Sequence, residues 1–145
     1  MDDPVRLTAR ILVMDDEESI LDVTSEILRV FGYEVGVATS GEMALKMYQE
    51  AMDEGNRYDI VIMDLTVPMG MGGGEAIIEL LKIDPQAKAI VSTGLVDEPL
   101  VKNFRSYGFV GILPKPYRMQ DLEKVVRAAL SEPKERRDTT VPRTE

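Results

Sequence analysis

The sequence contains no cysteine, no histidine and no tryptophan. The lack of cysteine excludes disulfides, thiolate nucleophiles and metal sites built on thiolates. The lack of histidine excludes Ser-His-Asp triads, imidazole zinc sites and a phosphohistidine formed within this chain. Acid–base and metal chemistry must therefore come from carboxylates, lysine, tyrosine or a bound ion.

Long apolar runs and excess positive charge are also lacking. No apolar run approaches the ~18 residues of a membrane-spanning helix, and no charged-then-apolar leader opens the chain. A cytoplasmic protein without membrane contact is therefore expected. Asp and Glu number 26 against 17 Lys and Arg, for a formal net charge of −9. Such a chain is a poor partner for nucleic acid and suits a cation or a basic protein surface.

The length of 145 residues fits a single domain that can bury its own core. Residues 1–9 form a short polar lead, and the domain itself is expected to span 10–131. Residues 132–145, which include Pro133 and Pro142, are expected to be a flexible tail or a linker.

Apolar runs alternate five times with amphipathic segments along the domain. The predicted strands are 10–14, 33–38, 58–64, 87–92 and 109–113, and the predicted helices are 18–31, 41–54, 75–83, 98–107 and 119–130. This alternation predicts parallel strands joined by right-handed crossovers, with helices on both faces. The expected fold is α/β: a flavodoxin-like, doubly wound, five-stranded parallel sheet of order 2-1-3-4-5 with five helices.

Carboxylates follow two strands that this order makes neighbours. Asp15 and Asp16 follow the first strand, and Asp64 ends the buried third strand. Ligands bind at the carboxyl edge of such sheets, where the strand order reverses. The three carboxylates are therefore expected to meet in one cleft.

Three ionised carboxylates cannot stay together unaided. Two unit charges ~4 Å apart repel by about 4 kcal/mol at an effective dielectric near 20. Either a proton is retained by the group or a cation binds. Oxygen ligands of this kind suit Mg²⁺, Mn²⁺ or Ca²⁺, and Mg²⁺ keeps open positions that a phosphoryl donor can fill.

Two further polar residues follow the fourth and fifth strands. Thr93 offers a hydroxyl donor and Lys115 a mobile positive charge for phosphate oxygens. With Asp64 as the nucleophile, this set supplies the positioning and charge neutralisation that phosphoryl transfer needs.

Each of these residues also has a plain structural interpretation. Asp64 alone suits a turn, the acidic run 15–18 suits a helix N-terminus, Thr93 suits a cap and Lys115 a solvated charge. Two other functions therefore stay open: a Mg²⁺-dependent phosphohydrolase with an aspartyl intermediate, and an interaction module with a purely structural acidic cleft.

Four segments in this order resemble the receiver (response-regulator) domain of two-component signalling. They are V-M-D-D-E at 13–17, V-I-M-D-L-T-V-P at 61–68, I-V-S-T-G at 90–94 and L-P-K-P-Y at 113–117. The resemblance implies a phosphoacceptor that switches conformation and whose partner is a sensor histidine kinase or a histidine phosphotransfer domain. It implies no enzyme with an external substrate, only self-catalysed phosphoryl transfer and slow autodephosphorylation, and no direct contact with nucleic acid.

The resemblance also implies a role for each acidic residue. Asp64 accepts the phosphoryl group from a kinase phosphohistidine. Asp16 and Asp64 ligate Mg²⁺, the backbone carbonyl of Thr66 is a further ligand, and Asp15 acts partly through water.

Further implied roles belong to residues near the fourth and fifth strands. Thr93 and Lys115 contact the phosphoryl oxygens, Thr93 couples their presence to loop movement, and the Lys115-Pro116 bond is cis. The second switch position, usually aromatic in the family, is Ile112 here. The glycine-rich loop before residue 75 is similar to receiver domains of hybrid sensor kinases. A hybrid-kinase origin is therefore expected, with a stand-alone response regulator as the alternative.

Overall fold

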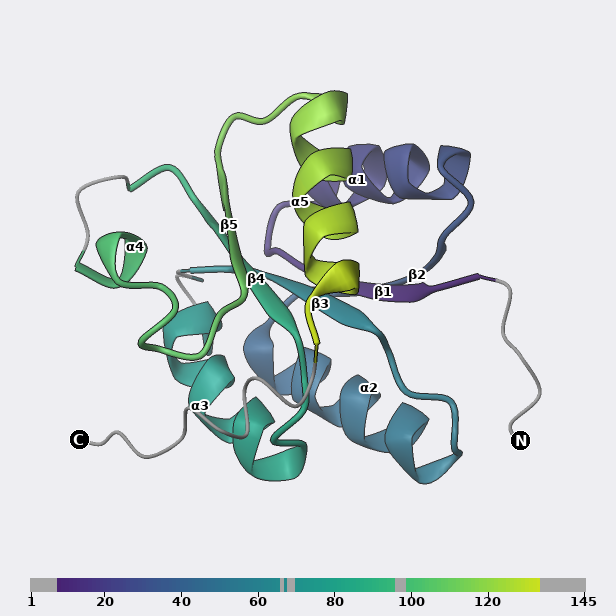
Figure 1. The fold of residues 1–145 in the computed structure, drawn as a ribbon, viewed down its shortest axis with the longest axis vertical. Coiled ribbons are helices and arrows are strands. Elements are labelled where there is room, and N and C mark those ends of the chain that lie inside the picture. The colour runs from purple at the N-terminus through teal and green to yellow at the C-terminus, as the bar shows by residue number, and fades with distance from the viewer. Residues whose placement is uncertain (1–7, 66, 68–69, 96–98, 134–145) are drawn as a thin grey trace.

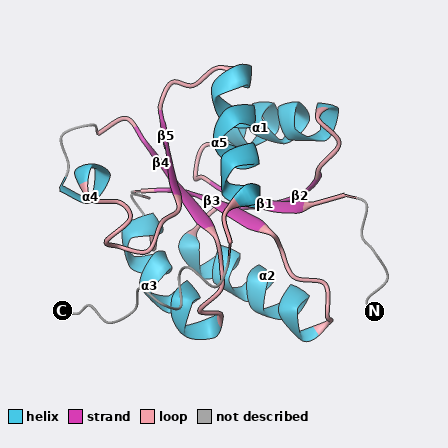
Figure 2. Ribbon diagram, viewed as in Figure 1, coloured by secondary structure: helices cyan, strands magenta, loops and turns pink. Residues whose placement is uncertain are grey.

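The computed structural model describes residues 8–65, 67, 70–95 and 99–133, and its centre is a five-stranded parallel sheet (Figures 1 and 2). The strands are β1 (Arg10–Met14), β2 (Glu34–Ala38), β3 (Ile60–Asp64), β4 (Ala89–Thr93) and β5 (Gly111–Pro114). Their order is β2-β1-β3-β4-β5. The predicted doubly wound α/β fold is therefore confirmed, with strand ends that differ from the prediction by at most two residues.

Helices cover both faces of this sheet. They are α1 (Glu18–Val30), α2 (Gly41–Asp53), α3 (Gly73–Ile83), α4 (Pro99–Lys102) and α5 (Met119–Ser131). In Figure 1, α1 and α5 lie on one side of the sheet and α2 and α3 on the other. The buried apolar residues accordingly form two clusters, one on each face. No helix in the described part of the chain is long and apolar enough to cross a membrane.

Local signals set several of the helix ends. The side chain of Ser40 accepts a hydrogen bond from the backbone N–H of Met43 at 3.2 Å, so Ser40 is the predicted N-cap of α2. Gly32, which follows α1, has a φ of +94°, a conformation that glycine adopts without the steric penalty of a side chain. Both ends were predicted from the sequence.

The prediction of a helix over 98–107 is wrong in extent. Residue 98 lies outside the described residues, and α4 spans only Pro99–Lys102. Beyond it most of the backbone bonds join residues three apart, as from the N–H of Tyr107 to the carbonyl of Phe104, which makes consecutive tight turns. The side-chain amide of Asn103 also donates to the carbonyl of Pro99, which accepts the backbone N–H of Asn103 as well.

The glycine-rich loop permits close packing beside β3. A Cβ on Gly73, the first residue of α3, would lie 2.9 Å from the carbonyl oxygen of Asp64. A Cβ on Gly41 would lie 2.7 Å from the carbonyl oxygen of Met71, which accepts a bond from the N–H of Gly41. The glycines therefore let α2 and α3 begin close to the end of β3. Their spacing does not match the glycine motifs of phosphate-binding loops.

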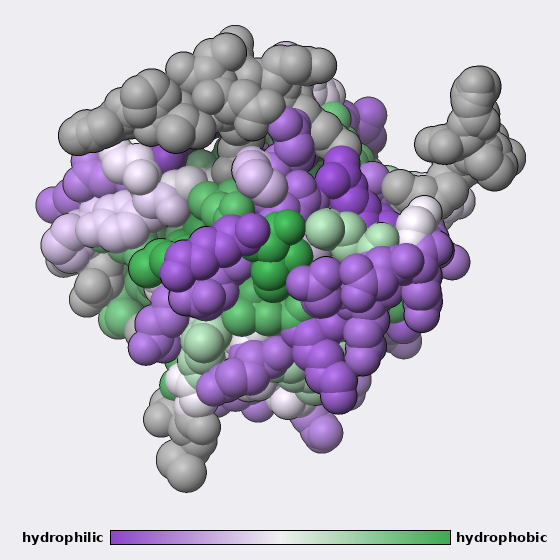
Figure 3. All heavy atoms as spheres, turned by 90° about the horizontal axis from the view of Figure 1, so that it is seen from below, coloured by the Kyte–Doolittle hydropathy of each residue, from purple (hydrophilic) through white to green (hydrophobic). Residues whose placement is uncertain are grey.

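Figure 3 shows the α2–α3 side of the molecule as a mostly polar face with an apolar area near its middle. Met43 of α2 and Ile78 of α3 are among the large apolar residues that remain exposed. Single exposed apolar residues are normal on a soluble surface, so this face places no constraint on function.

Candidate functional site

Three carboxylates meet at the carboxyl edge of the sheet. Met14 of β1 pairs with Met63 of β3, so the next residues, Asp15 and Asp64, lie side by side at the ends of neighbouring strands. One carboxylate oxygen from each of Asp15, Asp16 and Asp64 lies within 4.8 Å of the others. Asp15 and Asp64 are buried and Asp16 is exposed. The strand order therefore brings together the three residues that the sequence placed at this edge.

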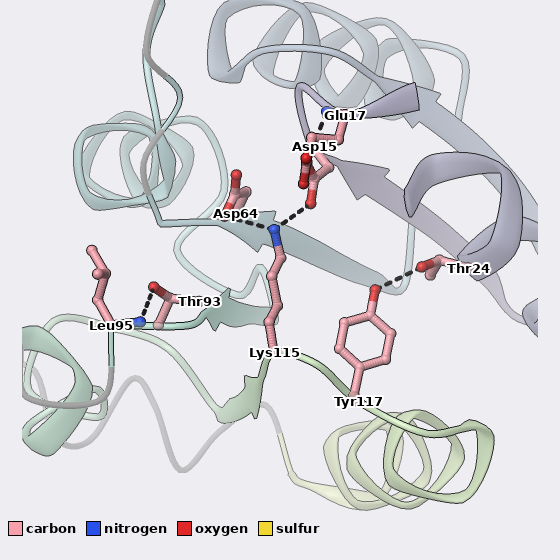
Figure 4. Close-up of polar contacts among 8 residues, drawn as sticks. All are labelled: Asp15, Glu17, Thr24, Asp64, Thr93, Leu95, Lys115 and Tyr117. Atoms are coloured by element: carbon pink, nitrogen blue, oxygen red, sulfur yellow. Dashed lines mark hydrogen bonds and ion pairs between the residues drawn. The ribbon is translucent and has the colours of Figure 1, made fainter. Parts of the chain in front are cut away.

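Lys115 reaches the same cluster from the end of β5 (Figure 4). Its ammonium nitrogen lies 2.8 Å from Oδ2 of Asp15 and 3.2 Å from Oδ1 of Asp64, and it donates to both. Burial works to lower the pKa of Lys115, but the bonds to Asp15 and Asp64 outweigh it and the pKa is raised. Lys115 is therefore a fixed cation beside the candidate nucleophile.

Asp15 uses both of its carboxylate oxygens. Oδ2 accepts from Lys115, while Oδ1 accepts from the backbone N–H of Glu17 at 3.0 Å. The second bond closes a turn of the Asx kind just before α1. Asp15 is thus held firmly by the protein, which suits a supporting place beside a cation rather than the place of the nucleophile.

The environment of Asp64 disfavours its ionised form. Burial and the nearby carboxylate of Asp15, opposed by Lys115 and assisted by Asp16, raise the pKa of Asp64 from 3.8 to about 6. The carboxylate is still mainly ionised at neutral pH, as a nucleophile must be. Ionisable groups whose pKa is strongly shifted by burial and by a nearby charge are common in functional sites.

The donor set fits a divalent cation. Three ionised carboxylates and one ammonium leave a formal charge of −2 within a small volume. All the available ligand atoms are carboxylate oxygens, which are the ligands of Mg²⁺ and Ca²⁺. The residues present therefore fit a hard divalent ion. Thr66, expected to add a backbone carbonyl, lies outside the described residues.

Thr93 lies at the end of β4 and is 3% exposed. Its hydroxyl oxygen accepts a hydrogen bond from the backbone N–H of Leu95 at 3.0 Å, so Thr93 does serve the local turn (Figure 4). The hydroxyl hydrogen is not used in that bond and can donate to another oxygen. The turn role and the predicted phosphoryl contact are therefore compatible.

Ile112 lies on β5, where the resemblance implies an aromatic switch residue. It is half-buried and packs against the cluster beneath α2 and α3. It also lines a groove of about 460 Å³ between β5 and α5. The Lys115-Pro116 bond is cis, as the resemblance implied.

Two polar features near the site were not assigned a role from the sequence. The phenol oxygen of Tyr117 lies 2.6 Å from Oγ1 of Thr24 in α1. Ser92, the register neighbour of Asp64, is buried and its hydroxyl has no partner among the described residues. The hydroxyl of Thr24 on the apolar face of α1 was the one sequence signal for its bond to Tyr117. Ser92 is identified as a neighbour of Asp64 only by the pairing of β3 with β4.

The raised pKa of Asp64 predicts how the stability of the fold depends on pH. Because the folded state holds the Asp64 proton more tightly than the unfolded state, ionisation of Asp64 destabilises the fold above about pH 6 and ceases to do so near its ordinary value of 3.8. A shift of this size corresponds to about 3 kcal/mol. We expect Asp64→Asn to raise the free energy of unfolding by up to about 3 kcal/mol at about pH 8 in EDTA.

Urea unfolding of both proteins between about pH 4 and pH 8 measures this effect. The stability difference must shrink as the pH falls through about 6. A difference that stays constant, or that grows as the pH falls, would show that Asp64 is not strained in its ionised form.

The comparisons with known proteins agree on one family. A family model described as the response regulator receiver domain matches residues 11–127. A response regulator receiver protein of Anaeromyxobacter is 36% identical over 107 residues, covering 74% of this chain and 42% of its own length. The chemotaxis protein CheY of Thermotoga maritima is 36% identical over 110 residues, covering 75% of this chain and 87% of its own length.

A solved structure supports the same assignment. The receiver domain protein of Methanospirillum hungatei, described as CheY-like, superposes with a TM-score of 0.74 at 26% identity, covering 91% of this chain and 98% of that one. Relatives of this chain differ in length, since the matched part is most of the Thermotoga protein and less than half of the Anaeromyxobacter one.

Proposed function

Since this chain belongs to the family of response regulator receiver domains, which accept phosphoryl groups in two-component signalling, we propose that Asp64 is its acceptor residue. The observation that carries this assignment is the contact of Asp64 with Lys115 at 3.2 Å inside a cluster of three carboxylates. Among the three, Asp64 ends the central buried strand and has its pKa raised to about 6 by burial and by Asp15.

The proposed reaction moves one phosphoryl group. A carboxylate oxygen of Asp64 attacks phosphorus in line with the bond to the donor nitrogen. That bond breaks, and its electron pair stays on the imidazole of the donor. The ammonium of Lys115 lies next to the attacking oxygen, so it can follow the phosphoryl oxygens as negative charge gathers there.

We propose that the divalent ion is Mg²⁺. Asp16 and Asp64 would hold it, Asp15 would support it, and the backbone carbonyl of Thr66 would complete the protein ligands. When bound, it would neutralise negative charge on the phosphoryl group and on the carboxylates. Lys115 already offsets one of the three negative charges, so the remaining −2 suits a divalent ion better than a monovalent one.

The proposed switch begins at Thr93 and Lys115. Both can donate to a phosphoryl oxygen, and the backbone N–H of Lys115 already donates to the carbonyl of Thr93, which joins the loops after β4 and β5. A phosphoryl group that draws both side chains inward would therefore shift the two loops together. Because Ile112 stands in place of an aromatic ring, it would contribute to the switch only through aliphatic packing.

We further propose that the donor is a sensor histidine kinase or a histidine phosphotransfer domain, met in the cytoplasm. The chain itself would turn over no external substrate and would lose its phosphoryl group slowly. The glycine-rich loop favours an origin in a hybrid sensor kinase, and a stand-alone response regulator is the alternative. The two relatives described above do not discriminate between these origins, since they differ in length and neither is described as a hybrid kinase.

The test is labelling by acetyl phosphate, a small donor that needs no partner protein. We expect intact-mass measurement to find one added phosphoryl group when Mg²⁺ is present and none when EDTA replaces it. Labelling that ignores EDTA would contradict the metal site. Continuous release of phosphate from a phosphate ester would instead favour the phosphohydrolase, and no label with no Mg²⁺ binding would favour a structural acidic cluster.

A further inference from the structure

The loop after β5 carries a second polar side chain that reaches across the molecule. Tyr117 follows Lys115 by two residues, and its phenol oxygen lies 2.6 Å from Oγ1 of Thr24 in α1, 93 residues away in the chain. Thr24 is 1% exposed. Figure 4 shows Tyr117 and Lys115 leaving the same loop, the first directed towards α1 and the second towards the carboxylates.

The bond is a specific polar link within an apolar layer. Thr24 lies on the buried face of α1 with Leu21 and Leu28, and Tyr117 packs against the apolar cluster under α1 and α5. A buried hydroxyl without a partner costs free energy, so the fully buried hydroxyl of Thr24 gains most from the bond to the half-buried Tyr117. Burial also raises the pKa of Tyr117, which keeps the phenol protonated at neutral pH.

Lys115 depends on the path of this loop more than a residue of a neighbouring strand would. The sheet order places β4 between β5 and β3, so Lys115 must cross the end of β4 to meet Asp64 and Asp15. A lysine side chain is long and flexible, and its ammonium is placed only as well as the backbone that carries it.

The loop is attached to the rest of the domain on both sides of the Lys115 side chain. On one side, the backbone N–H of Lys115 donates to the carbonyl of Thr93 at 2.9 Å. On the other, Tyr117 is bonded to Thr24 of α1. Without the second attachment, the loop would be held only at β4 and at the start of α5, where the backbone N–H of Arg118 donates to Asp121. The backbone between these two points, which carries Lys115, would then be less firmly placed relative to the carboxylates.

We propose that Tyr117 is a positioning residue for phosphoryl transfer: through its hydrogen bond to Thr24 it holds the loop after β5 against α1 and so keeps the Lys115 ammonium at Asp15 and Asp64. The proposal rests on the proposed function of Asp64 for its kinetic consequence. Its structural consequence, the placement of Lys115, holds whether or not Asp64 is the acceptor.

Two single changes remove the bond without removing the packing. Tyr117→Phe deletes only the phenol oxygen, and Thr24→Val replaces the hydroxyl with a methyl group of similar size. We expect each to slow labelling by acetyl phosphate by about 3- to 10-fold, and the double variant to be no slower than either single one. Tyr107→Phe, at a tyrosine that is 45% exposed, is the matched control and should label at the wild-type rate.

A second readout reports on Lys115 directly. The ammonium group of Lys115 can be titrated by NMR in the unphosphorylated protein, and its signal is assigned as the one that Lys115→Met loses. We expect its pKa to be lower in Tyr117→Phe and in Thr24→Val than in the wild type. A change that only loosened the fold elsewhere would not move this group. The titration needs no phosphoryl transfer, so it separates failure of this proposal from failure of the Asp64 assignment.

Each combination of results decides the matter. Slower labelling in both single variants, with no further loss in the double variant and a lowered Lys115 pKa, supports the proposal. An unchanged rate in Tyr117→Phe, losses that add in the double variant, or slower labelling with an unchanged Lys115 titration each overturn it. If the wild type takes no label, the Lys115 titration alone decides whether Tyr117 positions it.

Discussion

Replacing Asp64 with asparagine abolishes labelling by acetyl phosphate in the presence of Mg²⁺. The amide oxygen carries no negative charge and is a poor nucleophile, so the bond to phosphorus does not form. The change also lowers the negative charge of the cluster that Asp15 and Asp16 share with it, which weakens the attraction for a divalent cation. The rest of the fold is expected to remain intact, because this variant is predicted to be the more stable protein.

Intact-mass measurement over time gives the result, and Asp53→Asn provides the control. Asp53 is an exposed residue at the C-terminal end of α2. That end of the helix leads into the start of β3, so it lies away from the carboxyl edge of the sheet. The control should take up one phosphoryl group as the wild type does. A label that persists in Asp64→Asn would remove Asp64 from the role of acceptor, and peptide mapping would then locate the true site.

Replacing Lys115 with methionine slows labelling by about 10²- to 10³-fold, the loss seen when a preorganised donor is removed from a site of developing charge. Methionine keeps the length and apolar body of the side chain but offers no positive charge. Lys115 is the residue that lies within bonding distance of both Asp15 and Asp64, so nothing described nearby takes its place at those two oxygens.

The same change also destabilises the folded state. The side chains of Asp15 and Asp64 are 4% and 10% exposed, and they would lose their shared counter-charge. We expect a loss of about 2–3 kcal/mol at about pH 8 in EDTA, below the ~3–5 kcal/mol of a fully enclosed pair because this edge of the sheet is partly open. The loss should shrink as the pH falls, since protonation of Asp64 removes one of the two charges.

Urea unfolding and labelling kinetics measure both effects, with Lys46→Met, at an exposed lysine of α2, as the control. Lys115→Arg gives a further comparison: it keeps the charge but presents a planar fork, so stability should recover more than the rate. If Lys115→Met labels at the wild-type rate, the ammonium has no part in the transfer. If it is as stable as the wild type at high pH, the ion pair is not a structural support.

The central part of this fold was predictable because its signals are local and repeated. Each strand is a short apolar run, and β3 and β4 are buried at every position, as strands covered on both faces must be. Ser40 and Gly32 marked helix ends through chemistry that acts within a few residues. Parallel strands with crossover helices then leave few topologies to choose from.

The helix predicted over 98–107 shows where local pattern reading stops working. The segment has apolar residues at helical spacing, but among the residues of α4 only Leu100 is buried. A helix holds its length mainly by burying one face, and a segment with a single buried residue has little to gain. Beyond Lys102 the chain therefore continues in tight turns, and the side chain of Asn103 bonds back to the carbonyl of Pro99.

By itself, the sequence determined the order of strands and helices, the strand ends at which Asp15, Asp16, Asp64, Thr93 and Lys115 lie, and the family to which they point. These follow from spacing along the chain. Only the tertiary structure decided which of them touch: that Lys115 crosses β4 to bind Asp15 and Asp64, that Thr93 is engaged with Leu95, and that Tyr117 is bonded to Thr24. Such contacts depend on side-chain reach and on how α1 and the loop after β5 pack over the sheet, and residues up to 100 positions apart in the chain carry no local signal of them.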